Sequence, residues 1–105
     1  MLRLDSLSRE IRRELESVYG DRLCGVYIFG SYARGQADPE SDFDVLIVLD
    51  RVDSYGAEIE RTSELGSRLS LEFGVSISQV FVSESEWQAA ETPFLRNVRA
   101  EAVAA

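Results

Sequence analysis

The chain has 105 residues, 45% hydrophobic and 29% charged, which is typical of a folded protein and not of a disordered one. Its formal net charge of −8 argues against direct binding of nucleic acid, because such binding relies on a positive field. With no histidine present, carboxylates are left as the acid–base and metal-binding groups. We expect one domain over residues 1–105 and no membrane span.

The first thirty residues predict a helix followed by a strand. Apolar residues recur at spacings of three and four, which favours a helix that ends at Gly20. Its inward face is expected to hold Leu4, Leu7, Ile11, Leu15 and Val18. Residues 23–29 predict a strand, in which the single cysteine, Cys24, is expected to fill the core. The lone cysteine and the charged start at Met1–Asp5 favour a cytoplasmic location.

The next segment predicts a loop and a second strand. Residues 30–41 are rich in Gly, Ser, Asp and Pro, so we expect a loop, with one helical turn after Ser31. Residues 43–49 are almost continuously apolar, a pattern typical of a strand buried on both faces in the middle of a sheet.

The second half predicts a long helix, a third strand and two further helix starts. Asp53 or Ser54 can cap a helix that ends at Gly74, and residues 75–82 follow as a strand. The inward face of that helix is expected to hold Tyr55, Ile59, Thr62, Leu65, Leu69 and Phe73. Ser83 to Glu86 form a capping box, with Val82 and Trp87 as its hydrophobic staple, and Thr92-Pro93 begins a last helix. The order predicts an α/β (α+β) fold: a small mixed sheet of three or more strands with helices packed on it.

Three residues of the loop have the chemistry of a phosphate site. Gly30 has no Cβ, so backbone can approach a phosphate closely. Ser31 offers a hydroxyl and a backbone N–H, and Arg34 carries a forked cation that matches phosphate oxygens. The alternative for Arg34 is an ordinary surface salt bridge.

Two aspartates follow at the start of the second strand. Asp42 and Asp44 stand two apart, so both side chains leave the same face, with Cα atoms roughly 6.5 to 7 Å apart. Carboxylates so placed can share Mg²⁺ or Mn²⁺, together with substrate phosphates and water. An isolated Asp-x-Asp pair is more often a solvated strand end. Its coupling to Gly30, Ser31 and Arg34 favours the metal site.

Phe29-Gly30-Ser31 followed by Asp42-Phe43-Asp44-Val45 resembles the defining motif of the DNA polymerase β-like nucleotidyltransferases. The string GSYARGQADPESDFD is similar to the minimal nucleotidyltransferase (MNT) family, whose members are often antitoxin partners of HEPN-domain toxins. The resemblance implies a nucleotidyltransferase fold and transfer of a nucleoside monophosphate, most simply AMP from ATP, onto a hydroxyl of the partner. It assigns Gly30, Ser31 and Arg34 to the nucleotide, and Asp42 and Asp44 to magnesium and catalysis.

One departure from that family pattern keeps three functions open. Family members usually supply a third carboxylate from the next strand, where this chain has Ser76, and neither Ser76 nor Ser78 is a base at neutral pH. The chain could therefore be an enzyme that uses ATP or another NTP, or a degenerate nucleotide-binding antitoxin that acts by contact. A third alternative is a purely structural interaction domain. Dimerisation through the last helix or a sheet edge stays open.

Overall fold

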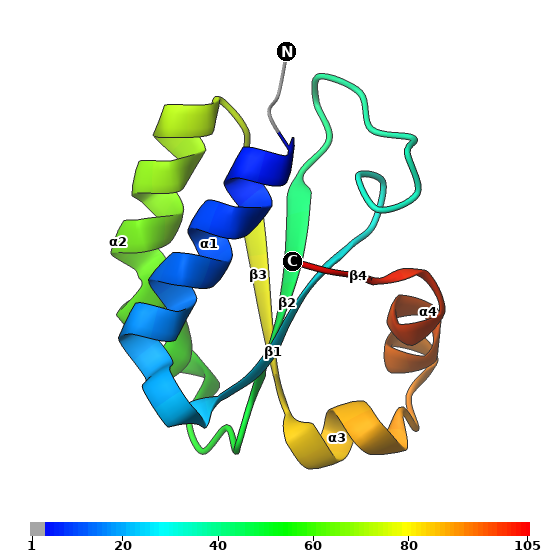
Figure 1. The fold of residues 1–105 in the computed structure, drawn as a ribbon. Helices are drawn as coiled ribbons and strands as arrows, with labels where there is room; N and C mark the ends of the chain where they lie inside the picture. The colour runs from blue at the N-terminus through cyan, green and yellow to red at the C-terminus, as the bar shows by residue number, and fades with distance from the viewer. Residues whose placement is uncertain (1–3) are drawn as a thin grey trace.

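In the computed structural model, which describes residues 4–105, a four-stranded sheet separates two pairs of helices (Figure 1). The strand order is β3-β2-β1-β4, with bounds Ile77–Ser83, Phe43–Leu49, Leu23–Phe29 and Val103–Ala104. Strand β2 is antiparallel to β1 and parallel to β3, so the sheet is mixed, as predicted. Strand β4, which was not predicted, is antiparallel to β1. Residues 1–3 of the charged start lie outside the described part.

Each face of the sheet is covered by two helices (Figure 1). Helices α1 (Leu4–Tyr19) and α2 (Tyr55–Phe73) pack on one face, and a short 3₁₀ helix, η1 (Gly20–Arg22), links α1 to β1. Helices α3 (Glu84–Ala89) and α4 (Pro93–Glu101) pack on the other. Among residues 4–105, no helix combines the length and the apolar character that a membrane span requires.

Strand β2 is buried on both faces, as the sequence predicted. Because side chains alternate along a strand, Phe43 and Val45 pack toward α1 and α2, and Leu46 packs toward α3 and α4. All three are fully buried. The two layers of the core therefore meet at this one strand.

The helix boundaries follow the capping signals in the sequence. Ser54 accepts a hydrogen bond from the Ala57 N–H at 3.3 Å, and Gly74 ends α2 with a φ of 66°. Ser83 and Glu86 form the predicted capping box of α3. Thr92 caps α4, and Pro93 follows it at the first helical position.

The inward faces of α1 and α2 differ from the prediction at four residues. Exposed instead of buried are Leu4, Val18, Tyr55 and Ile59. Tyr19 is buried in place of Val18, because the apolar stripe of α1 continues four residues after Leu15. Glu58 is buried in place of Ile59, with 4% of its surface exposed. The two buried residues meet where the Tyr19 hydroxyl donates to Glu58 Oε1 at 2.8 Å.

The buried Glu58 carboxylate is compensated by a polar cluster. Arg22 donates from Nη2 to Glu58 Oε2 at 3.1 Å, and Arg61 lies 3.6 Å from Oε1. Burial by itself raises the pKa of Glu58, but the hydrogen bonds from Tyr19 and Arg22 outweigh it, and the pKa is lowered. Burial and the Glu58 carboxylate in turn raise the pKa of Tyr19 well above its ordinary value, which keeps its hydroxyl a donor. A buried charge is tolerated here because both of its oxygens are paired.

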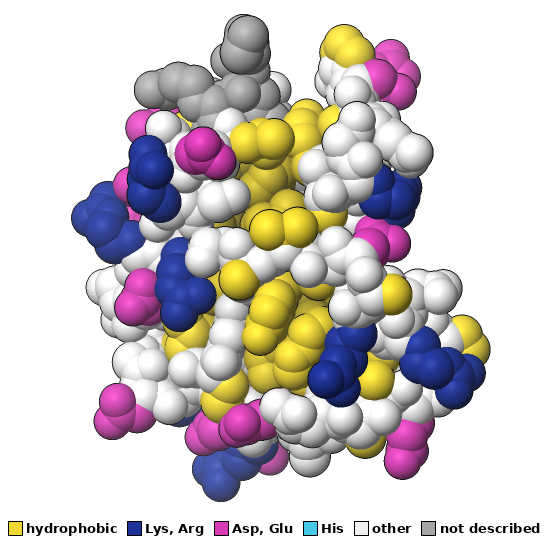
Figure 2. Space-filling model, turned by 45° about the vertical axis from the view of Figure 1, so that its right-hand side comes forward, with side chains coloured by type: hydrophobic (Ala, Val, Ile, Leu, Met, Phe, Trp, Pro, Cys, Tyr) yellow, Lys and Arg dark blue, Asp and Glu magenta, His cyan; other side chains and the backbone are white. Residues whose placement is uncertain are grey.

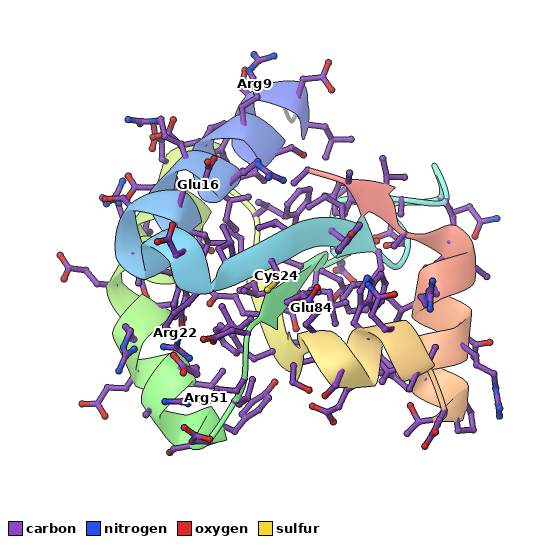
Figure 3. The ribbon with its side chains drawn as sticks, turned by 60° about the horizontal axis from the view of Figure 1, so that its bottom comes forward. Arg9, Glu16, Arg22, Cys24, Arg51 and Glu84 are labelled. Carbon is purple, nitrogen blue, oxygen red and sulfur yellow. The ribbon has the colours of Figure 1, made fainter. Side chains whose placement is uncertain are left out.

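Cys24 is exposed, so the expectation that it fills the core was wrong. The pairing of β1 with β2 shifts between Leu23 and Gly25, and Cys24 is the extra residue of this bulge. Its thiol donates to Glu84 Oε2 at the start of α3, 3.2 Å away (Figure 3). Partial burial and that carboxylate raise the pKa of the Cys24 thiol. The bulge turns Cys24 out of the apolar strand in which it was expected to be buried.

Charged side chains of both signs are interspersed on the face shown in Figure 2, around a band of exposed hydrophobic side chains. A hollow of about 300 Å³ between α1 and β4 is lined by residues that include Leu4, Ile28, Tyr32, Phe43 and Val103. On this face the arginines are not gathered into one basic surface.

We predict that Glu58→Gln lowers the free energy of unfolding by about 2 kcal/mol at neutral pH, since it removes the charge that Arg22 and Tyr19 bind. Because the folded-state pKa of Glu58 is lowered, its contribution is present above the unfolded value, about 4.3, and is lost as the pH falls through the folded value. Urea unfolding of both proteins from pH 7 to pH 3 measures the difference. Glu60→Gln, on the exposed side of α2, is the matched control. A difference that stays constant over this pH range would contradict the prediction.

Candidate functional site

Gly30 and Asp44 meet at the end of strand β1. Gly30 has a φ of 77°, and a Cβ added there would lie 2.2 Å from Asp44 Oδ2. The neighbouring residue Phe29 is the cross-strand partner of Asp44, so the β1–β2 pairing creates this contact. Any side chain at position 30 would collide with the carboxylate. The structure thus adds a second reason for glycine to the backbone approach inferred from the sequence.

The chain after Gly30 forms three overlapping hydrogen-bonded turns, in which the Gly35 N–H donates to the Tyr32 carbonyl at 3.3 Å. The helical turn expected after Ser31 takes the form of a single α-type turn between Gly30 and Arg34 and does not continue into a helix. The Arg34 N–H donates to the Gly30 carbonyl at 3.1 Å, and the Gln36 N–H donates to the Ser31 carbonyl at 2.9 Å. The Tyr32 ring packs edge-on against the buried Phe43 ring, with 5.5 Å between the ring centroids. This contact anchors the turns to the core. The backbone N–H groups of residues 31–33 donate to no acceptor within the described chain. They are left available to an anion.

The two aspartates predicted to bind metal interact electrostatically. Asp42 is exposed, and Asp44 is half-buried. Burial, and then the charges of Asp42 and Glu101, raise the pKa of Asp44, while the Arg34 guanidinium opposes them. A bound cation would relieve this repulsion.

The donors at this site fit magnesium. Within residues 4–105, no three Asp, Glu, Cys or His side chains form a metal-binding group. Asp42 and Asp44 are the two carboxylates that would hold a metal ion here. Magnesium commonly takes one or two carboxylates and completes its coordination with substrate phosphates and water.

Glu101 contacts the same loop and was not predicted from the sequence. Its Oε2 accepts hydrogen bonds from the Gly30 N–H at 2.7 Å and from Arg34 Nη1 at 3.0 Å. The side chain is 26% exposed. No local pattern marks this residue, because it reaches the site through the unpredicted pairing of β4 with β1.

The register of β2 and β3 places Ser78, and not Ser76, beside Asp44. Asp44 pairs with Ser78 in this parallel ladder, and paired residues point to the same face. Ser76 precedes the strand, and its carbonyl accepts the Phe43 N–H at 2.8 Å. The strand begins at Ile77, not at residue 75. Ser78 is therefore the residue beside Asp44, and it carries no carboxylate.

Comparison with known proteins identifies the family and the fold of this chain. The family model described as nucleotidyltransferase domain matches residues 8–103. A protein of Methanocaldococcus jannaschii, described as a candidate protein adenylyltransferase, is 34% identical over 77 residues, which are 73% of this chain and 77% of that relative.

Solved structures of toxin–antitoxin complexes share the fold. A chain from such a complex crystallised with AMP-PNP superposes with a TM-score of 0.66 at 21% identity, covering 92% of this chain and 70% of that one. A chain from the complex of a tri-AMPylated HEPN toxin with its MNT antitoxin, from Shewanella oneidensis, gives 0.59 at 17% identity, with 95% and 69% covered. The match over residues 8–103, together with the mixed sheet and the turn that follows Gly30, shows that the chain belongs to the nucleotidyltransferase domain family.

Proposed function

We propose that this chain is a magnesium-dependent nucleotidyltransferase that moves AMP from ATP to a hydroxyl group on a partner protein. The observation that carries the proposal is the Asp44 carboxylate packed against Gly30, beside a turn whose N–H groups at residues 31–33 have no acceptor in the described chain. The similarity to a relative described as a protein adenylyltransferase supports ATP as donor and a protein as acceptor. The shared fold with an antitoxin of a HEPN toxin supports a toxin as that partner.

The residues of the turn bind and orient the triphosphate in this proposal. The free N–H groups and the Ser31 hydroxyl donate to phosphate oxygens, and the Arg34 guanidinium balances their charge. Asp42 and Asp44 would hold Mg²⁺ or Mn²⁺, which when bound neutralises the triphosphate and lowers the pKa of the attacking hydroxyl. The acceptor oxygen attacks the α-phosphorus, and pyrophosphate leaves.

A second function, nucleotide binding without turnover, is favoured by one observation. Ser78 stands beside Asp44 where a third carboxylate would lie, and a serine hydroxyl does not accept a proton at neutral pH. Such a protein would regulate its partner by contact. The two functions differ in whether a label is transferred from ATP.

Labelled ATP, magnesium and the protein encoded by the neighbouring gene provide the direct test. We expect the wild-type chain to label the partner, and Asp44→Asn to lower the rate by about 100-fold or more, because it removes a charge from the metal site. Asp53→Asn is the matched control, since Asp53 is exposed and pairs with Arg51 outside the site. Equal labelling by wild-type and Asp44→Asn proteins would exclude this mechanism.

Aspartate substitutions at Ser78 and at Ser76 distinguish nucleotidyl transfer from nucleotide binding without turnover. They also test the β2–β3 register. We expect Ser78→Asp to raise the transfer rate by about 10-fold or more, because it places a base beside Asp44. Ser76→Asp should have little effect, since that residue lies before the strand. Transfer that first appears with Ser78→Asp would identify the wild-type chain as a degenerate member. A gain from Ser76→Asp alone would contradict the assignment of the position.

Alanine substitutions at two glycines with positive φ distinguish the effect of backbone strain from that of a collision with Asp44. Gly30→Ala and Gly35→Ala both place a side chain in the left-handed region, at about 1 kcal/mol or more of strain. A Cβ at residue 35 meets open space, whereas one at residue 30 meets the Asp44 carboxylate. We expect Gly30→Ala to abolish transfer and Gly35→Ala to retain most of it, measured alongside urea unfolding. Similar activity in the two variants would show that the contact with Asp44 is not required.

A further inference from the structure

The C-terminal strand delivers Glu101 to the candidate site. Strand β4 pairs with β1 so that Ala104 lies opposite Tyr27 and Val103 lies opposite Ile28. Continuing this antiparallel register by two residues brings Glu101 beside Gly30, where the 2.7 Å hydrogen bond is found. The Ala105 N–H donates to the Val26 carbonyl at 2.9 Å and fastens the strand. Glu101 is the last residue of α4, so its carboxylate is positioned by the end of that helix together with the strand pairing that follows it.

The contacts of Glu101 hold the Arg34 guanidinium in place. Arg34 donates from Nη1 to Glu101 and from Nε to Gln36 Oε1 at 3.2 Å. Two of its three nitrogens are thereby engaged, and Nη2 has no partner in the described chain. Glu101 also takes the Gly30 N–H but leaves those of residues 31–33 free. The Glu101 carboxylate therefore holds the Arg34 guanidinium and the Gly30 N–H, while the N–H groups of residues 31–33 stay available to a ligand.

A third acidic side chain near Asp42 and Asp44 is unfavourable by itself. The negative charge of Glu101 adds to the burial and the Asp42 charge that raise the pKa of Asp44. Its two hydrogen bonds, one of them to a charged partner, offset this repulsion. A residue without a hydrogen-bond acceptor would avoid the repulsion but would leave Arg34 untethered.

We propose that Glu101 is a positioning residue for nucleotidyl transfer, which acts through Arg34, while the hydrogen bond from the Gly30 N–H holds the Glu101 carboxylate in place. The inference rests on the proposed function. Glu101 holds the guanidinium beside Asp44, where charge develops on the transferred phosphoryl group, and Arg34 makes the contact with the nucleotide. A small displacement of such a group is enough to slow a reaction strongly.

A double-mutant cycle tests whether Glu101 acts through Arg34. We expect Glu101→Ala to lower kcat by about 10-fold while the KM for ATP changes by less than about threefold. Glu101→Gln keeps a neutral acceptor and should stay within about threefold of the wild type. In an Arg34→Ala background, Glu101→Ala should cost less than about twofold more. Glu91→Ala, at an exposed glutamate between α3 and α4, is the control.

Three outcomes would overturn the inference. A full 10-fold loss from Glu101→Ala in the Arg34→Ala background would show that Glu101 acts independently of Arg34. Tighter binding of ATP–magnesium by Glu101→Ala, by about threefold or more in calorimetry, would show that the carboxylate competes with the phosphates. If the wild-type chain itself transfers no label, the proposed function fails. An active wild type with an equally active Glu101→Ala variant defeats only the role of Glu101.

Exchange of the Gly30 amide hydrogen measures the tether without any activity. We expect this amide to be protected in the wild type and to exchange about 10-fold faster or more in Glu101→Ala, because its acceptor is lost. Glu101→Gln should be intermediate, and Arg34→Ala should change it little. Equal exchange rates in wild-type and Glu101→Ala proteins would show that the carboxylate does not hold the turn.

Discussion

Strand β2 has helices over both of its faces, and the placement of the candidate site depends on how that strand is oriented. Because consecutive side chains alternate, burial of Phe43 and Val45 under α1 and α2 directs Asp44 to the opposite face. There the apolar layer begins at Leu46, so Asp44 stays half-buried at its margin. A shift of one residue would place the carboxylate in the core, which is costly without a partner. The core thereby determines which face of the sheet carries the chemistry.

The elements of this fold could be predicted wherever the signal is local. The span of β1, the double burial of β2 and the caps at Ser54, Ser83 and Thr92 all depend on residues within a few positions of each other. Burial of Glu58 could not be predicted, because it needs Tyr19, 39 residues away, to make it acceptable. The exposure of Cys24 likewise follows from a bulge that is set by pairing between strands.

The residues of the candidate site also divide into those with a local signal in the sequence and those without one. Gly30, Ser31, Arg34, Asp42 and Asp44 lie within one short segment, and the structure brings them to one end of the sheet. Their roles toward nucleotide and metal remain predictions. Ser78 could be told from Ser76 only by the register of a parallel pair whose strands are joined through α2. Glu101 lies 71 residues from the glycine that it contacts, and the two-residue strand that brings it there has no sequence signature.

Strand β4 is short, and neither of its side chains is buried. Such a segment has little apolar contact to hold it, so we expect it to detach in sub-global opening events far more often than the whole domain unfolds. Each opening would loosen the hold on Glu101, which ends α4 two residues before the strand begins. The fraction of molecules with an ordered turn is then governed by a local equilibrium at the C-terminal edge, largely independent of global stability. Any ligand that binds this edge in its paired form would increase that fraction through thermodynamic linkage.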